Sequence, residues 1–255
     1  MSQRKVCVVS GSSSGIGAAT VRRFAREGWD VVVNFSRQAD PAQAVARQCR
    51  ELGATVLVVK ADIAADADCR RLAAETAAHF GRADVLVNNA GTTKFVPIND
   101  LDGLDGDDFQ RIYAVNVVGA YQMVRAFVPL LRAQPGAGIV NVSSVASMMG
   151  RGSSLAYMAS KGALNALTVG LARSLGPGIR VNAVAPGLVE TPWLAQGLGA
   201  QRYDSAVKDW CDKSVLAQTL QPEDVADAIW WLGAGAAKTT GEVLLLDAGM
   251  RLGRT

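Results

Sequence analysis

A tyrosine and a lysine four residues apart are the main candidates for proton-transfer chemistry. Tyr157 and Lys161 fall in a segment rich in helix formers, Ser154 to Leu175, and on a helix this spacing places both side chains on one face. A free tyrosine titrates near ~10, so acid and base work near neutrality needs a pKa lower by roughly 3 units, or about 4 kcal/mol. We expect the Lys161 ammonium to provide much of this shift, although the spacing alone is common by chance.

Two serines, Ser143 and Ser144, follow a short apolar run that begins at Gly138. One hydroxyl there could hold the oxygen of a substrate, but serine at a strand end is ordinarily a turn residue. A serine hydrolase is excluded because the chain has no G-x-S-x-G motif and its only histidine, His79, lies at the exposed end of another predicted helix.

The first apolar run is followed by a glycine-rich turn, Gly11-x-x-x-Gly15-x-Gly17, and then by an amphipathic helix. Such a turn lets the backbone approach a pyrophosphate, which the N-terminus of the helix attracts. The spacing differs from G-x-G-x-x-G, so the turn alone is equally well read as an ordinary flexible loop. A polar loop, Asn88-Asn89-Ala90-Gly91, ends a later strand at the same edge of the predicted sheet.

Short runs rich in β-branched residues alternate with helical segments along the whole chain. The expected strands are Lys5–Ser10, Asp30–Phe35, Thr55–Lys60, Val85–Asn88, Gly138–Ser143, Arg180–Ala185 and Glu242–Leu246. The expected helices include Ile16–Glu27, Pro41–Leu52, Asp66–His79, Phe109–Leu131 and Ser154–Leu175. Because the apolar runs do not alternate with polar residues, each strand should be buried on both faces.

This alternation predicts an α/β fold: a single doubly wound (Rossmann) domain over residues 1–255, with a seven-stranded parallel sheet and helices on both faces. Ligands should bind beyond the carboxyl ends of the strands. One long segment without a clear strand, Leu188 to Leu220, is rich in Trp, Leu and Gly. We expect it to form a helical lid over the substrate.

Composition limits the classes of function. The 255 residues carry a net charge of +3, with basic residues interspersed among acids, which argues against nucleic-acid binding. Four scattered cysteines form no C-x-x-C pair and suggest reduced thiols and no metal site. No signal sequence is evident, and no apolar stretch approaches the ~20 residues of a membrane span. We therefore expect a cytoplasmic protein without a membrane partner.

Taken together, the motifs resemble those of the short-chain dehydrogenase/reductase family along essentially the whole chain, with similarity to carrier-protein ketoacyl reductases. The matching residues, in order, are Gly11, Gly15 and Gly17, Asp62, Asn88 to Gly91, Asn116, Ser144, Tyr157 and Lys161, Pro186 and Gly187, and Thr191. The resemblance implies a hydride transfer between a nicotinamide cofactor and a carbonyl or secondary alcohol.

The resemblance also implies a role for each matching residue. Tyr157 would protonate the carbonyl oxygen, Ser144 would hydrogen-bond it, Lys161 would bind the ribose and depress the tyrosine pKa, and Asn116 would anchor a water linked to solvent. Ser144 is chosen over Ser143 because it lies thirteen residues before Tyr157. The cofactor-binding set is Gly11, Ser14, Gly15, Ile16, Gly17, Arg37, Asp62, Asn89, Gly91, Tyr157, Lys161, Pro186, Gly187 and Thr191.

The choice of cofactor depends on the end of the second strand. Phe35 stands where an acid would bind the 2′-hydroxyl of NAD, and Arg37 is available for a 2′-phosphate. Ser14 stands where NADP-using relatives often have a basic residue, so Arg37 is the one obvious partner. The sequence therefore favours NADP(H) over NAD(H).

Three further expectations concern assembly, substrate and competing functions. The segments Phe109–Leu131 and Ser154–Leu175 carry more apolar positions than one sheet-facing stripe needs, which predicts a homotetramer. The aromatic residues of the lid favour a hydrophobic or aromatic ketone over a sugar. A non-catalytic NAD(P)-binding sensor or scaffold, and an epimerase or dehydratase using the same pair, remain alternatives.

Overall fold

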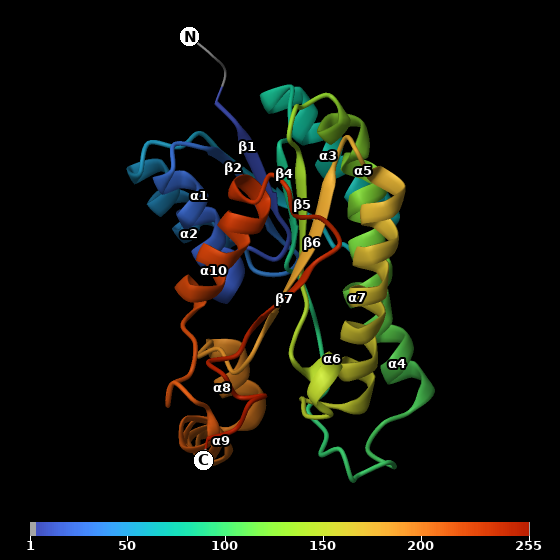
Figure 1. The fold of residues 1–255 in the computed structure, drawn as a ribbon. Coiled ribbons are helices and arrows are strands. Elements are labelled where there is room, and N and C mark those ends of the chain that lie inside the picture. The colour runs from blue at the N-terminus through green and yellow to red at the C-terminus, as the bar shows by residue number, and fades with distance from the viewer. Residues whose placement is uncertain (1–3, 255) are drawn as a thin grey trace.

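A single parallel sheet organises the chain, and the computed structural model describes residues 4–254. Its strand order is β3-β2-β1-β4-β5-β6-β7 (Figure 1). The strands are β1 Val6–Val9, β2 Asp30–Phe35, β3 Val56–Lys60, β4 Val85–Asn88, β5 Gly138–Val142, β6 Arg180–Pro186 and β7 Val243–Leu246. This confirms the predicted doubly wound fold, with each expected strand present and each strand end within one residue of its expected position.

Helices cover both faces of this sheet (Figure 1). One face carries α1 Gly15–Arg26, α2 Ala39–Glu51 and α10 Pro222–Trp230, and the other carries α3 Asp66–Phe80, α5 Ala120–Arg132 and α7 Leu155–Leu175. Successive strand residues serve opposite faces: Val9 packs in the core under α1, and Val8 packs in the core under α3 and α5. Burial on both faces explains why the strands are continuous runs of valine and leucine.

Between the fourth and fifth strands, the chain forms a loop and then one long helix in three parts. These are α4 Gly106–Tyr113, a π-helical turn η1 Ala114–Gly119, and α5. Asp105 starts the helix with a capping box, in which its carboxylate accepts from Asp108 N (2.8 Å) while the Asp108 side chain accepts from Asp105 N. The π-turn was not expected from the sequence, because its residues have ordinary helical periodicity.

The long helix is also the one described segment that bears on the expectation about membrane spans. By length and composition alone, Gly106–Arg132 could cross a bilayer. The reason is that apolar residues cover its outward face as well, where Val118 and Tyr121 are about half exposed. In this fold its inner residues Met123, Phe127 and Leu131 are fully buried against the sheet, so it is a core helix.

The strand order reverses between β1 and β4, so a crevice opens at the carboxyl ends of these two strands. The remaining elements gather at this end, in the lower part of Figure 1. They include α6 Ala146–Met149, α8 Pro192–Leu198 and α9 Ala200–Lys213. A second π-helical turn, η2 Trp231–Gly235, is not among them and directly follows α10. The expected lid segment, 188–220, is thus mainly two helices, and its two ends form an isolated parallel bridge between Val189 and Leu220.

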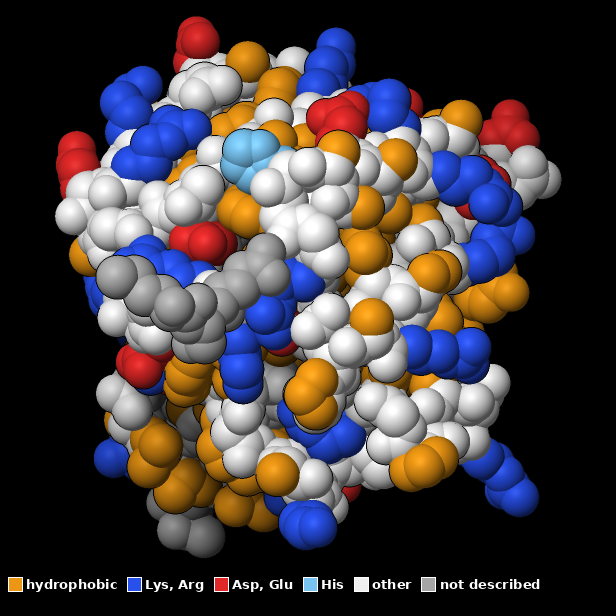
Figure 2. Space-filling model, turned by 90° about the horizontal axis from the view of Figure 1, so that it is seen from above, with side chains coloured by type: hydrophobic (Ala, Val, Ile, Leu, Met, Phe, Trp, Pro, Cys, Tyr) orange, Lys and Arg blue, Asp and Glu red, His pale blue; other side chains and the backbone are white. Residues whose placement is uncertain are grey.

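Figure 2 shows the opposite end of the molecule, viewed from above onto the amino ends of the strands. Lys and Arg side chains are spread around this face among Asp and Glu and do not gather into one stripe. His79 is exposed, at the end of α3 as predicted. The cysteines are free, with Cys7, Cys49 and Cys69 buried.

Candidate active site

The glycine-rich turn between β1 and α1 is shaped for an anionic ligand. Gly11 and Gly15 have φ values of +62° and +53°, which side chains rarely adopt. Ser14 occupies the N-cap of α1 but makes no capping hydrogen bond, and the first turn contains no acidic residue. The N–H groups and the positive dipole end of α1 therefore face the crevice without a side-chain partner, as a pyrophosphate site requires.

The turn and the loop after β4 are in direct backbone contact. A Cβ at Gly17 would lie 2.5 Å from Asn89 Nδ2 and from Gly11 O, and one at Gly11 would lie 2.9 Å from Ala90 Cα. Asn89 Nδ2 donates to the carbonyls of Ser10 (2.9 Å) and Gly11 (3.0 Å), and Ser10 Oγ accepts from the N–H groups of Asn89 and Ala90. The ends of β1 and β4 thus form one unit at the point where the strand order reverses.

A buried asparagine in β2 holds this turn from the other side. Asn34 Oδ1 accepts from Gly11 N (2.9 Å), and its amide donates to Ala61 O (3.0 Å). Ser12 N donates to Asn34 O (2.9 Å), and Ser12 Oγ accepts from Asn34 N (2.9 Å). The sequence analysis missed Asn34, although a polar residue in the otherwise apolar run Asp30–Phe35 was the signal that could have identified it.

Asn116 lies in the π-helical turn and joins the loop after β4 to α7. Its Oδ1 accepts from Thr92 N (2.8 Å), and its Nδ2 donates to Thr92 O and to Ser160 Oγ (both 3.0 Å). Both amide hydrogens are therefore used, so a water at Asn116 has only an Oδ1 lone pair or the backbone carbonyl to bind. A Cβ at Gly91 would lie 3.4 Å from Asn116 Oδ1 and 3.7 Å from Lys161 Nζ, which places these three residues together.

Tyr157 and Lys161 lie in the first two turns of α7 and share a face, as their spacing predicted. Ser154 caps this helix by accepting from Tyr157 N (3.3 Å). Lys161 Nζ is 5.5 Å from the centre of the Tyr157 ring and donates to Val142 O (2.7 Å), at the end of β5. The Ser144 side chain lowers the pKa of the Tyr157 phenol, and its Oγ accepts from Ala146 N (3.1 Å). Of the two candidate serines, Ser144 is therefore the one that faces Tyr157.

The expected depression of the tyrosine pKa is not found in the ligand-free protein. Burial raises the pKa of Tyr157 to about 12, and the hydrogen bond from Ser144 opposes only part of this effect. Burial also lowers the pKa of Lys161 to about 8. The sequence argument counted the attraction of the Lys161 cation but not the cost of removing both charges from water, which is larger here. Near pH 7 the phenol is thus protonated and Lys161 is mostly charged.

Ser143 has a different role from Ser144. Its hydroxyl donates to Asn165 Oδ1 (2.5 Å), Asn165 Nδ2 donates to Ser147 Oγ (2.9 Å), and Ser147 Oγ donates to the Ser144 carbonyl (2.7 Å). These hydrogen bonds attach the turn that contains Ser144 to α7. The point of attachment is Asn165, one helical turn after Lys161. Asn165 was missed by the sequence analysis because an asparagine in the middle of a helix has no spacing that identifies it.

The residues expected around the nicotinamide lie on the far side of the crevice. Thr191 caps α8 by accepting from Leu194 N (3.3 Å), and a Cβ at Gly15 would lie 3.5 Å from its methyl group. At the end of β6, the Pro186 carbonyl accepts from Val145 N (3.0 Å). Gly187 leaves room for the Trp210 ring, since a Cβ there would be 2.3 Å from Trp210 Cζ2. Thr191 thus lies beside the glycine-rich turn, just as Gly91 lies beside Lys161.

Two residues expected to contact the cofactor, Arg37 and Asp62, lie on the surface. Arg37 is exposed, two residues after β2 ends at the nearly buried Phe35. Asp62 is also exposed and its Oδ1 accepts from Ala64 N (3.0 Å), so the ligand-free chain uses it as a turn residue. Ile16 is half-buried and packs its side chain against the core under α1.

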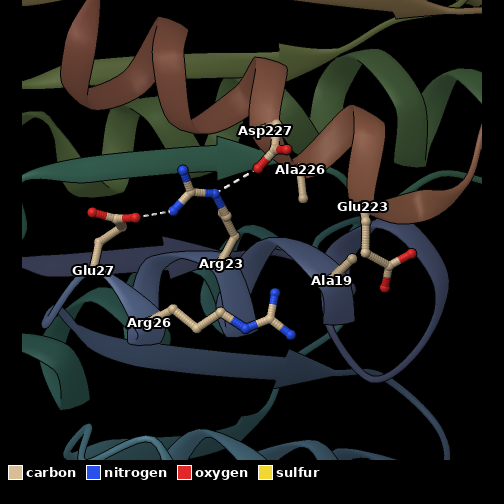
Figure 3. Close-up of a pocket in the computed structure, with 7 residues that line it drawn as sticks. All are labelled: Ala19, Arg23, Arg26, Glu27, Glu223, Ala226 and Asp227. Atoms are coloured by element: carbon tan, nitrogen blue, oxygen red, sulfur yellow. Dashed lines mark hydrogen bonds and ion pairs between the residues drawn. The ribbon is translucent and has the colours of Figure 1, made fainter.

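A hollow on the outer side of α1 and α10 is not part of this site. Figure 3 shows Arg23 there between Glu27 and Asp227, with Arg23 Nε 2.5 Å from Asp227 Oδ1. The two acids raise the pKa of Arg23, so its charge is already satisfied by the chain. The hollow lies along the exposed side of the two helices, away from the uncapped N-terminus of α1.

The chain is similar to known proteins along almost its full length. The family model described as enoyl-(acyl carrier protein) reductase matches residues 11–251. The chain is 41% identical to ketoacyl reductase 2 of the granaticin polyketide synthase from Streptomyces violaceoruber, over 97% of this chain and 96% of the relative. It is 36% identical to the L-fucose dehydrogenase of Mus musculus, over 98% of this chain and 89% of the relative.

A solved structure agrees with these relatives. A short-chain dehydrogenase/reductase from Burkholderia xenovorans superimposes with a TM-score of 0.91 at 43% identity, and covers 99% of this chain and 100% of its own. The relatives are oxidoreductases that act on different small molecules.

Proposed function

The chain belongs to the short-chain dehydrogenase/reductase family, and we propose that it transfers a hydride between NADP(H) and a ketone or secondary alcohol. The observation that supports this most directly is that Tyr157 lies with Lys161 and Ser144 beside the loop of Gly91, and that this loop contacts the glycine-rich turn. The cradle also fits a dinucleotide, because Gly11 and Gly17 leave no room for a side chain and α1 is uncapped.

In the reductive direction, bound NADPH supplies the hydride. Ser144 lies close enough to Tyr157 to lower the pKa of its phenol, so a carbonyl oxygen beside both hydroxyls can accept from both. Tyr157 then gives its proton to the alkoxide oxygen. The Lys161 ammonium, held by the Val142 carbonyl, stabilises the phenolate that remains. Asn116 and Ser160 hold the loop and helix on which these groups lie.

The function is tested by following absorbance at 340 nm with NADPH and NADH across ketones, ketoacyl thioesters, sugars and steroids. Oxidation of NADPH by at least one ketone is expected. Binding of the cofactor without turnover of any carbonyl would instead favour a sensor or scaffold, and product formation without net NAD(P)H consumption would favour an epimerase or dehydratase.

Cofactor preference gives the first prediction. Because Phe35 places no carboxylate beside the 2′ position and Arg37 is exposed nearby, kcat/KM should be higher with NADPH than with NADH. Arg37→Ala should raise KM for NADPH about tenfold and leave KM for NADH unchanged. Arg47→Ala, at an exposed position on α2, is the control. Equal or better kinetics with NADH in the wild type would contradict the assignment.

Assembly gives the second prediction, a cytoplasmic homotetramer. The long helices leave apolar side chains on their outer surfaces, with Phe109 38%, Val118 46%, Tyr121 45% and Val169 52% exposed. Self-complementary surfaces of this kind pair in symmetric oligomers. Light scattering at micromolar concentration should give four times the chain mass, and a stable monomer would contradict it.

The third prediction is that 188–220 closes over the substrate once cofactor is bound. No residue of α8 is buried, whereas the end of α9 is fixed through the buried Trp210 and an ion pair between Asp209 and Arg151 (2.8 Å). We expect α8 and the start of α9 to move about this anchored end. Trypsin should cut after Arg202, in the exposed first turn of α9, in the free enzyme and more slowly with NADPH. Equal rates would favour a permanently packed helix pair.

A further inference from the structure

Three aromatic rings from three separate segments form a row that ends at the proposed acid, Tyr157. The Trp193 ring, on α8, is central: its centre is 5.3 Å from that of Phe95 and 6.3 Å from that of Tyr157. The ring planes are tilted by 54° and 43° respectively. Despite these contacts Trp193 is 45% exposed, so a large part of its surface remains in water.

Gly197 allows this arrangement. Trp193 and Gly197 are four residues apart and therefore lie on the same side of α8. A Cβ at Gly197 would lie 1.9 Å from Phe95 Cε2, so the edge of the Phe95 ring occupies the space of a side chain at that position. Phe95 is thus seated against the backbone of α8, one turn beyond Trp193.

The loop that carries Phe95 is fixed relative to Tyr157. Val96 N donates to Ser153 O (2.8 Å), and the hydroxyls of Thr93 and Ser153 are 2.7 Å apart. Ser153 directly precedes Ser154, which caps the helix of Tyr157. Phe95 and Tyr157 therefore keep a fixed spacing, with Trp193 between them.

We infer that Trp193 and Phe95 form an aromatic subsite that takes the planar ring of an aryl ketone while the ketone oxygen meets Tyr157. This rests on the proposed reduction of ketones. A carbonyl held by Tyr157 has its substituent beside Trp193, and a planar ring gains most from the tilted and offset contacts that such rings offer. A sugar fits less well, because its hydroxyls would lose their water against the rings. The one hydroxyl that these rings carry, on Tyr157, is already bonded to the reacting oxygen.

The test compares two ketones of similar size, acetophenone and cyclohexyl methyl ketone. Conjugation makes the aryl ketone intrinsically less reactive, so the quantity that decides is how the ratio of their kcat/KM values changes between wild type and variant. Trp193→Ala should lower the kcat/KM of acetophenone relative to that of cyclohexyl methyl ketone about tenfold. Trp193→Phe should retain most of the wild-type ratio. Trp231→Ala, at a similarly exposed tryptophan (48%) on η2, should leave the ratio unchanged.

A second variant reaches the same subsite without removing an aromatic ring. Gly197→Ala should displace Phe95 and lower the ratio, because the added Cβ would lie 1.9 Å from Phe95 Cε2. A Trp193→Ala variant that slows both ketones equally would overturn the inference, as would wild-type enzyme that turns over an aldose better than either ketone.

Calorimetry separates this inference from the proposed function. Titration of each ketone into the enzyme with NADP⁺ should show tighter binding of acetophenone, lost in Trp193→Ala. If that pattern appears but no ketone is reduced, the proposed reaction fails and the aromatic subsite stands. If ketones are reduced but neither binding nor the kinetic ratio depends on Trp193, the subsite fails and the reaction stands.

Discussion

Replacing Tyr157 by phenylalanine is expected to lower kcat for ketone reduction at least ~100-fold while leaving the Kd of NADPH unchanged. Loss of a positioned proton donor typically costs about 10²-fold or more. The variant keeps the ring beside Trp193 and Lys161, so only the hydroxyl that Ser144 contacts is removed. Steady-state kinetics and a fluorescence titration with NADPH measure the two quantities. More than a tenth of wild-type kcat would assign the acid to another residue.

The matched control is Tyr121→Phe, at an exposed tyrosine on α5, which should retain wild-type kcat. The pH profile provides a second readout. With a pKa of about 12, Tyr157 stays protonated across the usual range, whereas Lys161 loses its charge near pH 8. The reductive kcat/KM of the wild type should therefore fall as the pH rises through about 8, because a neutral Lys161 cannot stabilise the phenolate. A flat profile up to pH 10 would contradict this assignment of Lys161.

Gly17→Ala is expected to weaken NADPH binding by about 10²-fold and to destabilise the fold by about 1–3 kcal/mol. The added methyl group would lie 2.5 Å from Asn89 Nδ2 and from Gly11 O, so the backbone of the turn must move. That movement separates Asn89 from the carbonyls it binds at Ser10 and Gly11. Calorimetry with NADPH and thermal unfolding measure the two effects.

Gly170→Ala is the control for this substitution. Gly170 lies in α7, an added Cβ meets no atom within 4 Å, and alanine favours a helix by about 1 kcal/mol over glycine. The control should therefore unfold at the same or a slightly higher temperature and bind NADPH normally. Wild-type affinity in Gly17→Ala would show that the turn does not hold the cofactor.

Most of the fold follows from local patterns in the sequence. Continuous valine runs such as Asp30–Phe35 identify strands buried on both faces, and their alternation with helices predicts the parallel sheet. The π-turn was not predictable, since Ala114–Gly119 has the composition of an ordinary helix. What selects the wider turn is tertiary: Asn116 must reach Thr92 and Ser160, which belong to segments distant in the chain.

In the candidate site too, features set within one element were predictable and features set by contacts between distant segments were not. Pairs whose geometry is set by one helix, such as Tyr157 and Lys161, were predicted from spacing. The sign of the tyrosine pKa shift was not, because it depends on burial by elements far apart in sequence. Asn34 and Asn165 were missed because each acts on a turn from a neighbouring element, and Phe95 because its contact with Gly197 forms only in three dimensions.

The π-helical turn also determines which kinds of genetic change this segment can accept. A π-turn holds one more residue than the α-helical turn it replaces, so deleting a single codon within Ala114–Gly119 would let the helix become continuous α-helix. Because the wider turn absorbs its extra residue locally, the helix after the deletion would keep its register, with Phe127 and Leu131 still against the sheet. The cost would fall on Asn116, whose amide would move away from Thr92 and Ser160. The extra residue therefore serves the position of Asn116 and not the packing of the helix.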